Sequence, residues 1–268
     1  MATPTRTAGR TSSLGCELAS WTQGSGPPVL FIQGTGLHGD GWLPQIEALH
    51  RDHTCLLFDN RGMGRSQPVG SGAITVEQMA LDAATVMDAV GWESAHVVGH
   101  SLGGCVAIEL ALARPERVRS LALLCTSAHG PDLVKMSPAM LWRGIRMQVG
   151  TRASRRRAFL EMVLTEAERR RSHAELDRLA RELEPVFGHD LAVVPKVVMR
   201  QVRAMGRWSA RDRLAQLAGL DTMVVGAEDD VIARIESVRA TAAAIPGARL
   251  VELAAAAHGV PVTAPERI

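Results

Sequence analysis

One short segment, in which glycines flank a serine between two apolar runs, constrains the fold more than any other. Residues 97–104 read Val-Val-Gly-His-Ser-Leu-Gly-Gly. Glycine on both sides of Ser101 permits a turn so tight that side chains there would collide, and the serine backbone in such a turn is strained. If a helix begins at Leu102, its amide N–H faces a developing negative charge. The segment therefore predicts a strand, a tight turn that presents Ser101, and a helix.

The rest of the chain alternates short apolar runs, bounded by Gly, Pro or Asp, with longer helical stretches. This alternation predicts an α/β protein with a mostly parallel central sheet flanked by helices. We expect strands at 29–33, 54–59, 95–99, 118–125, 221–226 and 249–253. We expect helices at about 44–50, 75–90, 102–113 and 232–244. Residues 131–217 show no strand pattern, which predicts several helices inserted between two strands.

Composition limits the class of protein further. The chain has 268 residues, 46% hydrophobic and 22% charged, which is typical of a globular domain and excludes a disordered chain or a coiled coil. No apolar run approaches the roughly 18 residues that a membrane span needs. Residues 1–13 are polar and lack the apolar core of a secretory signal, so we expect a flexible tail. Four widely spaced cysteines without a CxxC pair indicate reduced thiols and a cytoplasmic protein.

A serine hydroxyl becomes a good nucleophile only when a histidine takes its proton and an acid orients that histidine. Both partners are expected downstream of Ser101, each in a loop after a strand. His258 follows the strand at 249–253 and is the candidate base. Three consecutive carboxylates, Glu228, Asp229 and Asp230, follow the strand at 221–226. Any of the three could be the acid on this evidence.

From about residue 14 to the end, the chain resembles the α/β-hydrolase superfamily. Residues 59–66, Asp-Asn-Arg-Gly-Met-Gly-Arg-Ser, look like the DxRGxGxS segment that follows the family's fourth strand. The resemblance implies a core of residues 14–130 and 218–268, and a helical cap of residues 131–217 between strands 6 and 7. In the family the acid is usually the third residue after the glycine, which selects Asp229, with Glu228 and Asp230 as alternatives.

The family also implies where an oxyanion and a substrate would bind. Relatives often carry His-Gly after the third strand, whereas this chain has Gln-Gly-Thr-Gly at 33–36. Because the loop acts through a backbone N–H, the amides of Thr35 and Leu102 are the expected oxyanion donors. Gly34, His100 and Trp142 are the expected substrate-binding residues. Residues 42–45, Trp-Leu-Pro-Gln, look like the W-x-P-Q of the enol-lactonase and esterase branch.

Residues 34–39 also match GxGxxG after a strand, and Asp59 lies 20 residues beyond Gly39, as in a dinucleotide site. That motif places pyrophosphate on a helix that begins inside the glycines, whereas Gly41 and Pro44 delay the helix here. We therefore reject the dinucleotide interpretation.

The resemblance implies a serine hydrolase that cleaves a small ester or lactone without a metal or an organic cofactor. Thioesterases or acyltransferases acting on carrier-bound acyl groups, carbon–carbon bond hydrolases and cofactor-free perhydrolases use the same triad. A ligand-binding protein on this fold is the non-enzymatic alternative. Residues 131–217 hold 16 Arg and 2 Lys against 10 acidic residues. This excess of positive charge could attract an anionic substrate or an acidic carrier protein, but it is more simply a solvated face. No nucleic-acid or membrane partner is implied, and self-association is an open expectation.

Relatives usually end with a helix after the histidine loop. Here residues 263–266, Thr-Ala-Pro-Glu, form a helix-start pattern close to Ile268. Either the sequence is truncated at this point or another element covers the edge of the sheet. We expect the missing helix to lower stability and to favour association between copies of the chain.

Overall fold

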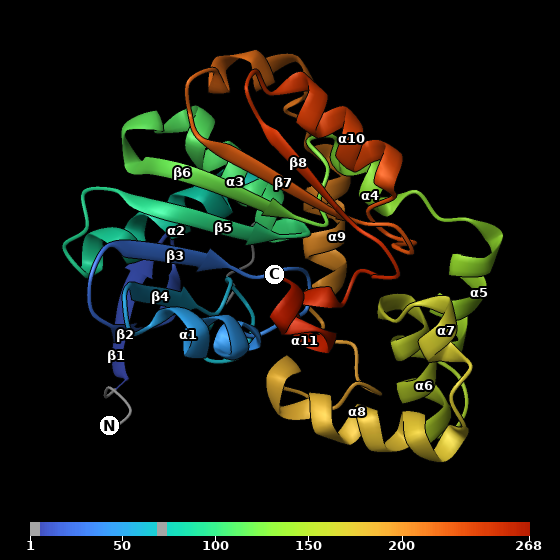
Figure 1. The fold of residues 1–268 in the computed structure, drawn as a ribbon. Coiled ribbons are helices and arrows are strands. Elements are labelled where there is room, and N and C mark those ends of the chain that lie inside the picture. Colours follow the sequence, from blue (N-terminus) through green and yellow to red (C-terminus); the bar gives the residue numbers. More distant parts are fainter. Residues whose placement is uncertain (1–5, 69–73) are drawn as a thin grey trace.

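The computed structural model describes residues 6–68 and 74–268. Its centre is an eight-stranded sheet in the order β1-β2-β4-β3-β5-β6-β7-β8 (Figure 1). The six strands from β3 to β8 run parallel, and β2 joins them antiparallel at β4. The strands are β1 (Thr7–Ser13), β2 (Cys16–Gly24), β3 (Pro28–Ile32), β4 (Thr54–Phe58), β5 (Ala95–His100), β6 (Val118–Leu124), β7 (Thr222–Ala227) and β8 (Arg249–Leu253). The six strands expected from the sequence correspond to β3–β8, so the mostly parallel sheet is confirmed.

Both faces of the sheet are covered, because neighbouring residues of a strand point to opposite sides. On β3, Leu30 and Ile32 belong to a core cluster with residues of several helices, while Val29 and Phe31 belong to a second cluster with Trp42 and Ile46. The first cluster includes residues of α2 (Val76–Ala89), α3 (Leu102–Ala113) and α10 (Ile235–Ala244). Trp42 ends the short turn η1 (Gly39–Trp42), and Ile46 lies in α1 (Leu43–Leu49). Apolar contacts on both faces hold the strand ends in fixed positions.

The flexible tail expected at the N-terminus is wrong for the part that the structure describes. Residues 7–13 form β1, which pairs antiparallel with β2 from Thr7 opposite Thr22 to Ser13 opposite Cys16. Most β1 side chains are exposed, because β1 is the edge strand and carries no apolar face. Its backbone pairing, rather than buried side chains, holds it in place. Residues 1–5 lie outside the described part.

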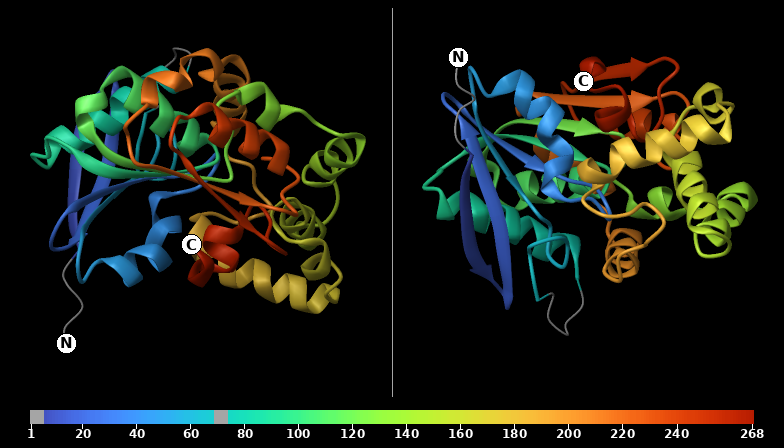
Figure 2. Two further views of the ribbon diagram at one scale, coloured as in Figure 1. Left: turned by 45° about the horizontal axis from the view of Figure 1, so that its top comes forward. Right: turned by 90° about the horizontal axis from the view of Figure 1, so that it is seen from below.

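Helices occupy the interval between β6 and β7, where the sequence shows no strand pattern. We call them the inserted helices: α4 (Gly130–Val134), α5 (Pro138–Arg146), α6 (Arg152–Val163), α7 (Glu166–Arg169), α8 (His173–Phe187) and α9 (Val198–Arg207). A separate apolar cluster between α6 and α8 includes Leu160, Ala180 and Phe187. Figure 2 shows the yellow-green and yellow helices at the end of the molecule opposite the blue strands. Every helix in residues 6–68 and 74–268 is too short or too polar to cross a membrane.

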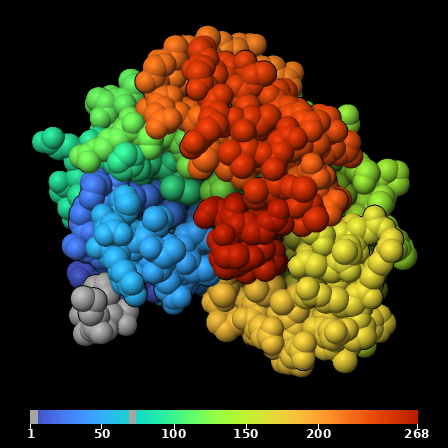
Figure 3. All heavy atoms as spheres, in the orientation of Figure 1, coloured from blue at the N-terminus to red at the C-terminus, as the bar shows by residue number. Residues whose placement is uncertain are grey.

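The last residues of the chain close the gap between α1 and α8. They form α11 (Val260–Thr263) and the turn η4 (Pro265–Arg267). In the space-filling view this red segment lies between the light-blue residues around α1 and the yellow inserted helices (Figure 3). The Gln45 side chain of α1 donates to the Pro261 carbonyl at 2.7 Å, and Val262 packs against the α6–α8 cluster. After residue 263 the described chain forms the short turn η4.

A buried ion pair joins the β4 loop to α2. Arg61 and Asp82 are 2% and 1% exposed and approach to 2.5 Å. The Arg61 Nε donates to the second carboxylate oxygen at 2.6 Å, and the Ser13 hydroxyl also donates to Asp82. Removal of the carboxylate from a buried pair takes away the attraction that offsets the desolvation of the guanidinium. This contact therefore ties the N-terminal hairpin, the β4 loop and α2 together.

We expect Asp82→Asn to lower the free energy of unfolding by about 3–5 kcal/mol, because it removes the buried negative charge that lies against the Arg61 guanidinium. Asp88→Asn is the matched control: Asp88 lies on the same helix and pairs with Arg117 at 2.6 Å, but its side chain is 63% exposed. The control should cost no more than about 1 kcal/mol. Urea unfolding of both variants gives the comparison, and equal losses would contradict it.

Candidate active site

The backbone at Ser101 has the strained conformation that the flanking glycines predict. Ser101 has φ 54° and ψ −120° and directly precedes α3. A Cβ added at Gly99 would lie 2.4 Å from the Gly103 carbonyl oxygen, and one added at Gly103 would lie 2.1 Å from the Ile32 carbonyl oxygen. Both contacts are shorter than real Cβ atoms allow. Only glycine fits on either side of the turn, so the sequence pattern has a steric cause.

The Ser101 turn lies at the point where the order of the strands reverses, between β3 and β5. β3 pairs with β4 on one side and with β5 on the other, so the loops after β3 and β5 diverge at this point. Such a switch point, at the carboxyl ends of parallel strands, is where ligands bind in open α/β sheets. A Cβ at Gly34 would lie 3.2 Å from the Ser101 Cβ. The loop after β3, including Thr35, therefore runs directly past Ser101.

The two amides expected to bind an oxyanion belong to these two loops. Leu102 is the first residue of α3, where unpaired N–H groups and the helix dipole favour a negative charge. Thr35 lies one residue after Gly34 and lines the same cavity as Ser101. Gly34 itself is packed against Ser101 and His100. The structure thus brings these residues together around Ser101.

His258 is buried and lines the same cavity as Ser101, and its carboxylate partner is Asp230. The His258 Nδ1–H donates to Asp230 Oδ2 at 2.7 Å. The other carboxylate oxygen of Asp230 accepts the N–H groups of Ile232 at 2.7 Å and Ala233 at 2.9 Å. These bonds fix the carboxylate and leave Nε2 as the ring nitrogen of His258 that can take a proton.

The structure therefore corrects the choice of Asp229, which rested on counting three residues from Gly226. The chain continues one residue further before it turns: the Glu228 N–H still bonds the Leu253 carbonyl, and the Asp229 N–H bonds the Ala256 carbonyl. The Asp230 N–H then closes a turn onto the Ala227 carbonyl at 3.2 Å. The side chain that reaches His258 is consequently the fourth after the glycine, and Asp229 is half-buried away from it.

His100 and Cys125 form the buried surroundings of His258. The His100 ring lies 4.8 Å from the His258 ring between centroids, and its Nε2–H donates to the His258 carbonyl at 3.0 Å. Burial and the neighbouring His258 lower the pKa of His100 to about 3, so His100 stays neutral near pH 7. His100, His258 and Cys125 each offer one side-chain atom that could bind a metal ion, and these three atoms lie within 4.8 Å of one another. Burial also holds the pKa of the Cys125 thiol well above its usual range, so the thiol is protonated near pH 7.

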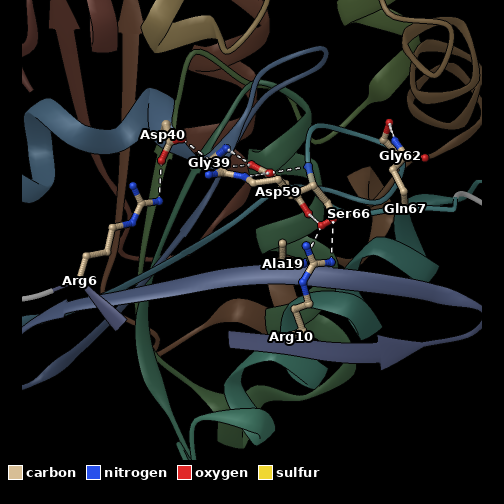
Figure 4. A network of polar contacts seen from close by, with 10 residues as sticks. Arg6, Arg10, Ala19, Gly39, Asp40, Asp59, Gly62, Ser66 and Gln67 are labelled. Atoms are coloured by element: carbon tan, nitrogen blue, oxygen red, sulfur yellow. Dashed lines mark hydrogen bonds and ion pairs between the residues drawn. The ribbon is translucent and has the colours of Figure 1, made fainter. Parts of the chain in front are cut away.

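Residues 59–66 hold the loop after β3 in place through hydrogen bonds rather than forming a nucleotide site. Asp59 accepts the Gly39 N–H at 2.8 Å and the Arg65 N–H at 2.9 Å, and the Ser66 hydroxyl donates to the Asp59 carbonyl at 2.6 Å (Figure 4). The Asn60 side chain donates to the Gln33 carbonyl at 2.8 Å. The Asp59 carboxylate that a dinucleotide site would use for ribose is therefore bonded to two backbone N–H groups and to the Arg65 side chain.

Ser101 and His258 open into one cavity of about 270 Å³ between the sheet and the inserted helices. Its floor consists of polar residues at the strand ends, namely Gln33, Thr35, His100, Ser101 and His258. Its wall is apolar and includes Leu133, Val134, Met136, Met140, Met147, Phe159, Met162, Val163, Phe187, Val198, Val202 and Met205. Trp142, expected from the sequence to bind substrate, does not line the cavity: it lies on the outer side of α5 and is 61% exposed.

Comparison with known proteins agrees with this geometry. A family model described as the alpha/beta hydrolase fold matches residues 27–265. The chain belongs to this family. It is 33% identical over 246 residues, 91% of this chain and 88% of the relative, to RutD of Azorhizobium caulinodans, which carries the provisional name of carbamate hydrolase.

Two solved structures of alpha/beta hydrolases illustrate the likeness. A thermophilic esterase from Thermogutta terrifontis is 28% identical with a TM-score of 0.74, over 98% of this chain and 94% of the esterase. The enol-lactonase from Burkholderia xenovorans is 23% identical with a TM-score of 0.79, over 97% and 96% of the two chains. The second likeness shows the fold, and together with the named relative the comparisons support a hydrolase.

Some residues that hold the hydrolase site carry no recognisable sequence signal. The buried Gln201 of α9 accepts the Gly36 N–H at 3.0 Å, and His189 bonds the Gly36 carbonyl at 2.9 Å. These contacts attach the loop after β3 to the inserted helices. The Thr126 hydroxyl donates to the Ser101 carbonyl at 2.7 Å. None of these residues belongs to a motif, so only the folded structure identifies them.

Many arginines of the inserted helices are neutralised locally. Arg157 pairs with Asp177 at 2.7 Å, and Arg156 pairs with Asp190 at 2.6 Å. Arg152 also contacts Asp190. The Arg156 guanidinium holds the pKa of the Asp190 carboxyl well below its usual range. These pairs favour the interpretation of the arginines as a solvated structural face.

We expect Gly103→Ala to destabilise the hydrolase by about 2–3 kcal/mol, because the new methyl group would displace the end of β3 from α3. Gly144→Ala is the control, since the nearest atom to a Cβ at this helical glycine is the Met136 Cε at 3.6 Å. The control should gain up to about 1 kcal/mol, because alanine loses less backbone freedom on folding. Urea unfolding measures both, and a neutral Gly103→Ala would contradict the steric account.

Proposed function

We propose that this protein is a serine hydrolase that cleaves small carboxylic esters or lactones through an acyl-enzyme intermediate. One observation carries the proposal. Ser101, held in a strained turn, opens into the same cavity as His258, whose Nδ1–H is bonded to Asp230 at 2.7 Å. Nucleophile, base and orienting acid are the parts that acyl transfer requires, and they follow the chain order of this fold.

In the first half of the reaction, the Ser101 Oγ attacks the substrate carbonyl carbon. His258 Nε2 takes the hydroxyl proton, and the Asp230 carboxylate stabilises the resulting imidazolium ion. The carbonyl oxygen gains the negative charge and accepts hydrogen bonds from the N–H groups of Leu102 and Thr35. When the tetrahedral intermediate collapses, the bond to the leaving oxygen breaks and His258 returns the proton to that oxygen.

In the second half, a water molecule replaces the leaving group. His258 takes a proton from this water, whose oxygen attacks the acyl carbon, and then protonates the Ser101 Oγ as it departs. The products are a carboxylic acid and the free serine. For a lactone, the leaving hydroxyl group stays attached to the acyl chain. His100 remains neutral near pH 7 beside His258, so it adds no positive charge that would oppose the imidazolium.

The relatives support this class of reaction without fixing the substrate. An esterase and an enol-lactonase share the fold, and the RutD relative is provisionally named for carbamates. All three substrate types present a carbonyl carbon bonded to a leaving oxygen or nitrogen. A panel of esters, lactones and a carbamate ester therefore tests the proposal across the range that the relatives suggest.

The direct test is a burst of p-nitrophenol from a short p-nitrophenyl ester. Acyl-enzyme chemistry releases one equivalent per site before the steady state when deacylation is the slower step. We expect Ser101→Ala and His258→Ala to abolish the burst and to lower kcat at least roughly 10⁴-fold, because each removes a part that acts only with the other. Rapid-mixing absorbance at matched protein concentrations measures both quantities.

Circular dichroism of both variants is the folding control. Turnover that survives unchanged in Ser101→Ala would contradict the proposal. So would a parent protein that turns over no member of the panel and is not covalently labelled at Ser101 by a fluorophosphonate.

The identity of the acid gives a second test on neighbouring residues. We expect Asp230→Asn to lower kcat roughly 10⁴-fold, because an amide stabilises the wrong tautomer of His258 and cannot balance an imidazolium charge. Asp229→Asn is the matched control and should retain kcat within about threefold, since Asp229 does not reach His258. Steady-state kinetics on the same ester decide between them, and the reverse ranking would restore Asp229 as the acid.

A further inference from the structure

The cavity above Ser101 divides sharply into a polar end and an apolar end. Its polar residues all lie at the carboxyl ends of the strands, around the proposed reaction centre. The surface contributed by the inserted helices consists of aliphatic, aromatic and methionine side chains. Asp, Glu, Lys and Arg are absent from the described residues that line it. A substrate bound here would meet polar groups only near its carbonyl.

Methionine is concentrated on this wall to an unusual degree. Five of the chain's 11 methionines, Met136, Met140, Met147, Met162 and Met205, line the one cavity. They come from the α4–α5 link, α5, the residue after α5, α6 and α9. Because methionine is unbranched and has three rotatable bonds, such a wall adapts to flexible apolar chains of different lengths.

The volume sets the scale of the ligand. At about 270 Å³ the cavity is much larger than the roughly 30 Å³ that a water molecule occupies, and it approaches the lower range of small-molecule pockets. A carbamate or an acetyl group alone would leave most of the apolar wall without a partner. Burial of a charged group at the wall is strongly unfavourable, because the wall offers no counter-charge.

From these observations, and resting on the proposed function, we infer that the substrate carries an uncharged apolar chain of several carbon atoms beside its scissile carbonyl. The chain occupies the methionine-lined wall, while the carbonyl lies on the polar floor. The apolar chain could belong either to the acyl part or to the alcohol part of an ester. Two substrate series, one for each part, distinguish these cases.

The acyl series consists of p-nitrophenyl acetate, butyrate, hexanoate and octanoate. The alcohol series consists of ethyl, butyl, hexyl and octyl acetate, followed by acid release. We expect kcat/KM to rise about twofold to fourfold per added methylene in one series, up to the length that fills the cavity, because each buried methylene adds transition-state binding. In the rising series, the six-carbon chain that ends in a carboxylate should react at least about tenfold more slowly than its uncharged counterpart. This substrate is the mono-p-nitrophenyl ester of adipic acid, compared with the hexanoate, or 6-acetoxyhexanoate, compared with hexyl acetate.

A substitution in the wall tests where the chain binds. Val202 lines the cavity from α9. Because it fills space, Val202→Phe should lower the ratio of kcat/KM for the six-carbon substrate to kcat/KM for the two-carbon substrate by tenfold or more in the rising series. Val202→Ala, which enlarges the cavity, should move the best chain length upward. Val193→Phe is the matched control, since Val193 is exposed and does not line the cavity, and it should leave the ratio unchanged.

Calorimetric binding of neutral methyl ketones, from 2-butanone to 2-decanone, to the Ser101→Ala variant gives a readout independent of turnover. Affinity should rise with chain length. If ketone affinity and both ester series are flat while the parent still shows its burst, the inference on the chain is overturned and the serine hydrolase stands. If affinity rises but no ester or lactone reacts and Ser101 is not labelled, the proposed function fails and the apolar ligand site remains.

Discussion

The tight packing of β3, β5 and α3 around Ser101 is the constraint on which the rest of the site depends. Gly99 and Gly103 let these elements approach more closely than any side chain permits. That approach forces the positive φ at Ser101 and places its hydroxyl and the Leu102 amide at the sheet switch point. Backbone strain of this kind persists only where the surrounding structure enforces it. Here, apolar clusters on both faces of the sheet supply that support.

The parts of the fold that depend on buried apolar runs could be predicted from the sequence. The six parallel strands and the Ser101 turn follow from alternation and from glycine sterics, which are local properties. The strand β1 could not be predicted this way, because it is an exposed edge strand whose side chains carry no apolar pattern. Its place depends on pairing with β2, a contact that only the folded chain makes.

The candidate site also contains some residues that the sequence identifies and others that depend on contacts made only in the folded chain. His258 is identifiable because it follows the last strand. The choice among three adjacent carboxylates depends on whether the chain turns at Asp229 or Asp230, and hydrogen bonds to the β8 loop decide that. An aromatic side chain such as Trp142 is a reasonable candidate for a pocket residue. The orientation of α5 about its own axis, however, turns Met140 into the cavity and leaves Trp142 exposed to solvent. Helix rotation is set by packing between helices that are far apart in sequence.

The origins of the site residues also have a consequence for the order of folding. Ser101 precedes the inserted helices, whereas Asp230 and His258 follow them, so the site joins two segments separated by more than a hundred residues. During synthesis from the N-terminus, the sheet from β1 to β6 can pair before β7 and β8 exist. The carboxylate–imidazole contact forms only once both late strands have added to that edge. The Asp230–His258 hydrogen bond, on which the proposed chemistry depends, is therefore among the last contacts that the chain can make.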